Sequence, residues 1–132
     1  MNLAIDTNAY RAFLDGEKRC VEMFREAKSI AVPVVVLGEL RAGFAYGNQP
    51  LQNEAILARI LSSNRLRVLE VGEATSHLYA AVWASLRKKR KPIPTDDIWI
   101  AAQCIEADVT LLTRDHHFDN VDGLRTLNWS RP

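Results

Sequence analysis

Short apolar runs alternate along the chain with longer segments whose apolar residues recur at helical spacing. The apolar runs predict buried strands over residues 2–5, 29–33, 66–71 and 109–113, with a possible fifth strand at 124–127. Helices are predicted over residues 6–16, 17–28, 34–47, 50–63, 73–91 and 95–108. Because strands alternate with helices, the pattern predicts an α/β fold in which helices flank a central parallel sheet.

The length and composition are typical of one globular domain. The chain has 132 residues, 48% of them hydrophobic and 25% charged, and we expect residues 1–132 to form a single domain. Cys20 and Cys104 lie far apart in no metal-binding spacing, which suits reduced thiols in a cytosol. The longest apolar run, residues 30–38, is too short to span a bilayer, and the N-terminus lacks the basic start of a secretion signal. We therefore expect a cytoplasmic protein with no membrane partner.

Glu39 is a single carboxylate among small and apolar residues in the stretch VVVLGELRAGF. In a helix it shares a face with residues three and four positions away, which are Val35, Val36, Ala42 and Gly43. This face is predicted to be shielded from solvent, where an unpaired charge is costly. Because no lysine or arginine stands one turn away on that face, Glu39 is predicted to meet a cation from elsewhere.

Further acids fall where the ends of parallel strands come together. Asp6 directly follows the first strand, Asp115 lies just past the fourth, and Asp96 and Asp97 begin the helix before the fourth strand. Ligands of such sheets bind outside the carboxyl ends of the strands, and right-handed crossovers start helices near the same edge. Each aspartate alone is equally explained as a turn residue or helix cap. Together they predict a cluster, in which mutual repulsion raises at least one carboxyl pKa.

Clustered carboxylates predict a site for Mg²⁺ or Mn²⁺, which bind oxygen ligands, water and substrate phosphates. A metal held in this way lowers the pKa of bound water and stabilises the leaving oxygen of a phosphoryl displacement. The implied chemistry is phosphodiester hydrolysis. Thr7, Asn8 and Thr113 stand beside the acids and are candidates for orienting a water, a substrate or a carboxylate, although ordinary polar turn residues explain them equally well.

At these residues the sequence resembles the PIN-domain ribonucleases, and among them the VapC toxins of toxin–antitoxin pairs. The resemblance rests on four stretches in the family's order, IDTNAYRAFLDG, VPVVVLGELRAGF, IPTDDIWIAA and LLTRDHHF. It implies that the metal-binding and catalytic acids are Asp6, Glu39, Asp97 and Asp115, with Thr113 as the polar residue beside the last strand. Two positions depart from frequent family forms. Relatives often carry another residue at the position of Asp96, and many carry an aspartate at the position of His117. Asp119 is a weaker candidate for the fourth acid.

The resemblance also implies a fold, an activity and partners. It implies a PIN-like three-layer fold and an endoribonuclease that depends on Mg²⁺ or Mn²⁺. The enzyme would be a homodimer, held inactive by a cognate VapB-type antitoxin whose tail enters the active site. The RNA substrate of such toxins is structured, commonly tRNA or rRNA.

A net charge of +1 means that RNA must be met by a local basic patch. Candidates for substrate binding are Lys88, Lys89 and Arg90 in the run RKKRK, and Arg11, Arg41 and Arg114 beside the acid motifs. Bases at a helix C-terminus and solvated surface residues are the alternatives. Three tryptophans, Trp83, Trp99 and Trp129, are expected in packing rather than base stacking, and His116 and His117 in an exposed turn rather than at a metal.

Two rival hypotheses remain from the sequence. A haloacid-dehalogenase-like phosphohydrolase or a receiver domain also places an aspartate after the first strand, but Asn8 stands where a second aspartate of the former is needed. A non-catalytic RNA-binding or protein-binding module with the same fold is the other, and the presence of all four acids argues against it.

Overall fold

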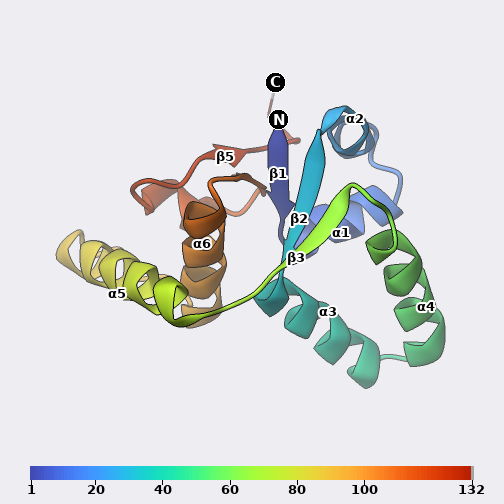
Figure 1. The fold of residues 1–132 in the computed structure, drawn as a ribbon, viewed down its shortest axis with the longest axis horizontal. Coiled ribbons are helices and arrows are strands. Elements are labelled where there is room, and N and C mark those ends of the chain that lie inside the picture. The colour runs from blue at the N-terminus through green and yellow to red at the C-terminus, as the bar shows by residue number, and fades with distance from the viewer. Residues whose placement is uncertain (132) are drawn as a thin grey trace.

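A five-stranded parallel sheet forms the centre of the computed structural model, which describes residues 1–131 (Figure 1). The strands are β1 (Asn2–Ile5), β2 (Ser29–Pro33), β3 (Leu66–Leu69), β4 (Thr110–Leu112) and β5 (Thr126–Leu127). Their spatial order is β3-β2-β1-β4-β5, and every neighbouring pair is parallel. Apolar residues of β1, β2 and β4 are buried, as expected for strands covered on both faces.

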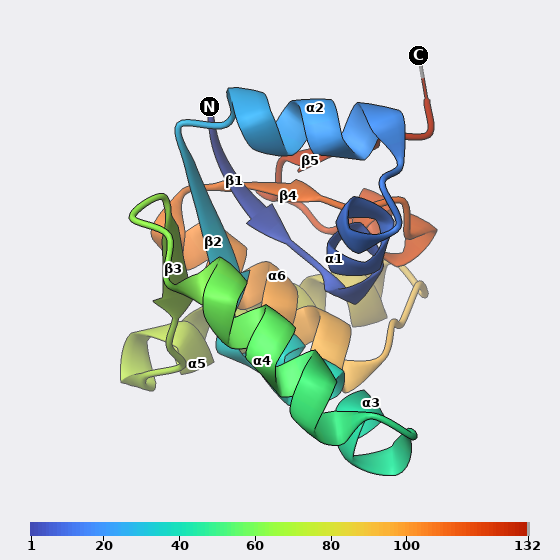
Figure 2. The same cartoon turned by 90° about the vertical axis from the view of Figure 1, so that its right-hand side faces the viewer.

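Helices cover both faces of this sheet. They are α1 (Thr7–Leu14), α2 (Lys18–Glu26), α3 (Val34–Tyr46), α4 (Pro50–Leu61), α5 (Glu73–Lys88) and α6 (Thr95–Ala107), followed by a 3₁₀ turn, η1 (His116–Asn120). Helices α1, α2 and α4 lie on one face, and α6 with α5 outside it lies on the other (Figures 1 and 2). The predicted three-layer α/β fold with a parallel sheet is confirmed.

Several element ends differ from the sequence prediction. The third and fourth strands stop at Leu69 and Leu112, short of the predicted residues 71 and 113, and the fifth strand covers only two residues. Helix α5 ends at Lys88 instead of 91, because Arg90 adopts a left-handed backbone with φ of 60°. The turn η1 was not predicted, since a single 3₁₀ turn has no apolar periodicity to reveal it.

The order of the strands creates a crevice at one edge of the sheet. From β1 the chain moves outward through β2 and β3 on one side, and then crosses to β4 on the other side of β1. Parallel α/β sheets bind ligands outside the carboxyl ends of the strands at such a reversal. Asp6 directly follows β1, and Asp115 lies three residues beyond the end of β4. The topology therefore brings distant acidic segments to one place.

Among residues 1–131, no helix is both long enough and apolar enough to cross a membrane.

Candidate functional site

A pocket at the carboxyl edge of the sheet contains all four acids that the sequence singles out. It is lined by Asp6, Thr7, Asn8, Arg11, Glu39, Asp97, Ile100, Asp115 and Phe118. The acids come from four separate places: the start of α1, the middle of α3, the start of α6, and the segment between β4 and η1. The structure thus brings Asp6, Glu39, Asp97 and Asp115 together, as the strand-edge argument predicts.

Asp6 is the most buried of these acids, with 6% of its surface exposed. It is the N-cap of α1, where its Oδ1 accepts a hydrogen bond from the Ala9 backbone N–H at 2.8 Å. Its Oδ2 accepts a hydrogen bond from the buried Thr113 hydroxyl. The same hydroxyl oxygen accepts a hydrogen bond from the Asp115 backbone N–H at 3.0 Å. Thr113 therefore links the segment of Asp6 to the segment of Asp115. Burial raises the pKa of the Asp6 carboxyl above its usual value.

Replacing Thr113 by valine is expected to destabilise the protein and loosen the site. The isosteric change removes the donor to Asp6 and the acceptor for the Asp115 N–H, so the free energy of unfolding should fall by about 1–3 kcal/mol. Metal affinity should fall about 10- to 100-fold, as for other residues that support a metal ligand. Denaturant unfolding and metal titration measure the two effects.

The control for this variant is Thr110→Val on the same strand. Among residues 1–131, the hydroxyl of Thr110 makes one hydrogen bond, which it accepts from Arg125 Nε at 3.5 Å, and Thr110 does not line the acidic pocket. If Thr113→Val binds metal as tightly as Thr110→Val does, Thr113 has no positioning role.

Glu39 lies in the middle of α3 and is half-buried. Its Oε1 accepts a hydrogen bond from the Thr7 hydroxyl at 2.9 Å. Burial, together with the neighbouring Asp96 carboxylate, raises the pKa of Glu39 to about 7. The prediction that its whole helix face is shielded is wrong: Val36 is buried, but Ala42 and Gly43 are exposed, because α3 continues beyond the edge of the sheet (Figure 1). Glu39 is therefore shielded from solvent at the crevice, and not by a continuous apolar face of α3.

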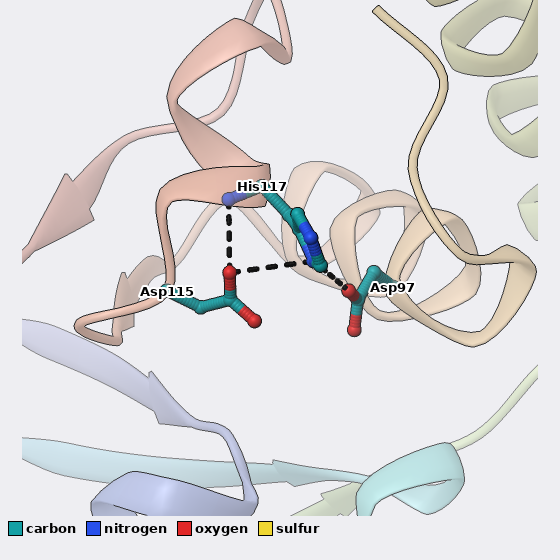
Figure 3. Close-up of side chains that lie close together, drawn as sticks. All are labelled: Asp97, Asp115 and His117. Carbon is teal, nitrogen blue, oxygen red and sulfur yellow. Dashed lines mark hydrogen bonds and ion pairs between the residues drawn. The ribbon is translucent and has the colours of Figure 1, made fainter.

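Asp97 belongs to two possible groups of metal ligands. One group is Asp97, Asp115 and His117, and the other is Glu39, Asp96 and Asp97; within each group the ligand atoms lie within 4.8 Å of one another. Figure 3 shows the first group, with the His117 ring between the two carboxylates. Asp6 lines the same pocket but belongs to neither group. Asp96, the less secure candidate of the sequence analysis, lies within the second group.

The acids of this cluster are not paired with lysine or arginine, and His117 is the one basic side chain of residues 1–131 within ion-pair distance of any of them. Across residues 1–131, no lysine or arginine forms an ion pair with any of the five acids Asp6, Glu39, Asp96, Asp97 and Asp115. The pKa of Asp97 is raised, first by burial and then by the nearby Asp96 and Asp115. Repulsion between carboxylates, the predicted cause, is therefore secondary to burial. An oxygen-rich, negatively charged donor set of this kind fits a hard divalent cation.

Comparison with known protein families assigns this chain to one of them. The family model described as PIN domain matches residues 3–124. This chain belongs to the PIN-domain family. The resemblance seen in the sequence is confirmed, and the family match disfavours a haloacid-dehalogenase-like enzyme or a receiver domain.

Relatives of this PIN domain include proteins named as ribonucleases. Ribonuclease VapC4 of Mycobacterium tuberculosis is 32% identical over 87 residues, which cover 66% of this chain and 67% of the relative. Ribonuclease VapC2 of Rickettsia felis is 26% identical and covers 96% of this chain and 97% of its own. A solved structure of similar fold is VapBC2 from Rickettsia felis bound to a promoter DNA fragment. It superposes with a TM-score of 0.84 over 98% of this chain and 99% of the solved chain, at 26% identity. VapBC-1 from nontypeable Haemophilus influenzae shares the fold, with a TM-score of 0.87 at 20% identity over 99% of this chain and 100% of that one.

The candidate substrate residues of the PIN domain are divided between the pocket and other surfaces. Asn8 and Arg11 line the acidic pocket, and both also line an adjoining pocket with Arg114. The Thr7 hydroxyl is already bonded to Glu39. Arg41 does not reach the pocket, because its Nε is paired with Glu54 on α4 at 3.0 Å.

The basic end of α5 also lies outside the acidic pocket. Lys88, Lys89 and Arg90 are exposed, and none of them lines it. The Lys89 ammonium donates to Asp122 at 2.6 Å and to the Asn120 carbonyl at 2.9 Å. These bases stay candidates only for contacts with RNA beyond the pocket.

The tryptophans of the PIN domain mostly pack within the protein, as expected. Trp99 stacks on Tyr79 with ring centroids 4.2 Å apart, and Trp129 is 3% exposed. Trp83 is more open, with the Arg87 guanidinium over its ring at 4.6 Å.

His117 is the site residue that sequence reasoning missed. Both histidines lie exposed in the turn η1, as expected, and His116 contacts Asp119. The sequence did not predict that the Nδ1 of His117 reaches two acids of the site. The available signal was its position two residues after Asp115, where a tight turn folds the side chain back toward the acid.

Proposed function

We propose that this PIN domain is a metal-dependent endoribonuclease, the toxin of a toxin–antitoxin pair. The observation that carries the proposal is the pocket in which Asp97 joins two groups of potential metal ligands, none of which forms an ion pair with a lysine or arginine among residues 1–131. The resemblance of 66% and 96% of the chain to two proteins named Ribonuclease VapC supports the same activity. The proposed reaction is hydrolysis of an RNA phosphodiester bond.

The proposed cofactor is Mg²⁺ or Mn²⁺, held by Glu39, Asp97 and Asp115 with Asp6 beside them. When bound, such an ion lowers the pKa of a water molecule and stabilises the leaving oxygen of the phosphodiester. The chain's own hydrogen bonds fix the ligands: Thr113 orients Asp6, and Thr7 orients Glu39. Because these carboxylates are held before any ion arrives, little side-chain rearrangement opposes its binding.

Arg11 is the base best placed to meet a substrate phosphate. It lines the acidic pocket, and its guanidinium lies over Gly43 of α3, where a Cβ would be 3.6 Å from Nη2. Asn8 and Arg114 extend this surface into the adjoining pocket. We propose that Arg11 and Arg114 neutralise backbone phosphates next to the scissile bond, and that the basic end of α5 meets a more distant part of the RNA.

Replacing Arg11 and Arg114 by glutamine is expected to weaken RNA binding and flatten its dependence on salt. Each lost phosphate contact should lower the logarithmic salt slope by about 0.7 for single-stranded RNA. The same measurement on Lys88→Gln, Lys89→Gln and Arg90→Gln tests the distant contact. Arg41→Gln is the matched control, because Arg41 is paired with Glu54. A slope unchanged by the Arg11 and Arg114 replacements assigns both to solvated surface.

The proposed partners are an RNA, an antitoxin and a second copy of the chain. The structures of the Rickettsia felis and Haemophilus influenzae relatives are of VapBC complexes, which supports a VapB-type antitoxin here. We propose that an arginine of the antitoxin fills the acidic pocket, that the toxin is a homodimer, and that it acts in the cytoplasm on structured RNA such as tRNA or rRNA. An arginine-containing peptide should inhibit cleavage, and its alanine version should not.

Expression of the chain alone in cells tests the proposed activity. New RNA 5′ ends should appear at defined positions with the wild-type chain, and should be absent with Asp97→Asn at the same protein level. Identical RNA ends for both proteins would instead support a non-catalytic binding module with a PIN fold.

A further inference from the structure

The exposed imidazole of His117, in the turn η1, lies against two of the acids that line the pocket. Its Nδ1 lies 2.9 Å from Asp97 Oδ2 and 3.3 Å from Asp115 Oδ1 (Figure 3). The backbone N–H of His117 donates to the same Asp115 oxygen at 2.9 Å. The ring is thereby held against two carboxylates that come from different elements.

These distances are those of neighbouring ligands on one metal ion. Two donors bound at right angles, each at about 2.1 Å from an ion, lie about 3.0 Å apart. An ion pair of protonated His117 with both carboxylates would give the same two contacts, and metal titrations and spectroscopy separate it from a shared metal ion. His116, one residue earlier, makes the simpler contact, with Asp119 alone among the acids of the described chain.

We propose that His117 binds the divalent metal directly through Nδ1, together with Asp97 and Asp115. This inference rests on the proposed function, because it concerns the same metal. Any proton on Nδ1 passes to solvent when the ion binds, since the metal takes the same lone pair. Both ions favour oxygen ligands, but Mg²⁺ demands near-ideal octahedral geometry and gives up its water reluctantly, so exchange of an oxygen for an imidazole nitrogen disfavours Mg²⁺ more than Mn²⁺. The site is therefore selective for Mn²⁺ over Mg²⁺, and His117 is the residue that determines this selectivity.

Titration of the metal-free protein with Mn²⁺ and with Mg²⁺ measures the selectivity directly. His117→Gln should raise the Kd for Mn²⁺ about 10- to 100-fold and change the Kd for Mg²⁺ much less. His116→Gln is the matched control and should leave both Kd values within about twofold, because surface changes away from the site have small effects. A thermal melt in chelator confirms that each variant is folded.

The nitrogen ligand itself is detected by electron spin-echo spectroscopy of the Mn²⁺-loaded protein. Wild type and His116→Gln should show modulation from a coordinated nitrogen, and His117→Gln should lose it. If His117→Gln does not fold, ¹⁵N-histidine labelling of the double variant His77→Gln/His116→Gln, in which His117 is the remaining histidine, shows whether the nitrogen on the metal belongs to His117.

Several results would overturn the inference while leaving the proposed function intact. They are Mn²⁺ binding without nitrogen modulation, modulation that survives in His117→Gln, and tighter Mn²⁺ binding by His117→Gln, which would show that the imidazole only occupies the place of the metal. Failure of the wild-type protein to bind Mn²⁺ or Mg²⁺ at all would overturn the proposed function as well.

Discussion

Asp97→Asn is expected to lower metal-dependent RNA cleavage by at least about 100-fold. Loss of a residue that merely supports a metal ligand costs about 10- to 100-fold, and Asp97 is the one carboxylate shared by both potential ligand groups among residues 1–131. Asparagine keeps the size of the side chain but removes its negative charge and one oxygen donor. Initial rates on total RNA at saturating metal measure the effect.

Other aspartates provide the comparison for this variant. Asp6→Asn should be similarly inactive, because Asp6 lines the pocket next to Asp115. Asp96→Asn should matter less, since Asp96 belongs to one ligand group only. Asp119→Asn should cleave within about twofold of wild type, because Asp119 is paired with His116 outside the pocket. Undiminished turnover by both Asp6→Asn and Asp97→Asn would refute the metal mechanism.

Asp97→Asn is also expected to raise the melting temperature of the metal-free protein. At neutral pH the wild-type protein holds one buried and several half-buried carboxylates together, and the pKa values of Asp6, Glu39 and Asp97 are all raised, chiefly by burial. Removing one charge relieves part of this cost. A relief of about 1 kcal/mol would raise the melting temperature by roughly 2–8 °C in a domain of this size.

The pH dependence of this effect follows from the direction of the pKa shifts. The pKa of Glu39 rises from 4.5 in the unfolded chain to about 7 in the folded protein. Between these values the folded state binds more protons than the unfolded state, so this contribution to stability is complete below pH 4.5 and is lost as the pH rises to 7. The metal-free wild-type protein should therefore melt at lower temperature as the pH rises through this window, and Asp97→Asn should show a weaker decline.

Melting curves in chelator and in excess metal test the expected rise in melting temperature of Asp97→Asn and its pH dependence. Metal stabilises the native state by binding to it, so the wild-type protein should gain more from Mg²⁺ or Mn²⁺ than Asp97→Asn does. A variant that melts below wild type in chelator, or gains as much from metal, would show that Asp97 is structural and lies outside the metal site.

The layers of the fold and the clustering of the acids at one edge of the sheet could both be predicted from the sequence alone. Short apolar runs predicted the strands, and the rule that ligands bind at the carboxyl ends of parallel strands placed Asp6 and Asp115 at one edge. These inferences succeed because strand direction and helix order fix the position of residues next to strand ends. They depend little on the orientation of any single side chain.

Features that depend on side-chain direction or on the angle between helices were not predictable. Arg41 stands two residues from Glu39 in the sequence, but α4 packs beside α3 and gives it Glu54 as a partner. Ala42 and Gly43 are exposed because α3 extends past the sheet, which no local pattern reveals. His117 reaches the acids only because the short turn η1 folds it back toward Asp97.

Cleavage of RNA by purified protein before and after removal of metal tests the central claim most directly. Total RNA is incubated with the wild-type protein in chelator, and then with Mg²⁺ or Mn²⁺ restored in excess, with Asp97→Asn in parallel. We expect no cleavage in chelator, full recovery when metal is restored, and no recovery for Asp97→Asn. Cleavage that continues in chelator and yields the same RNA ends would contradict a metal-dependent active site.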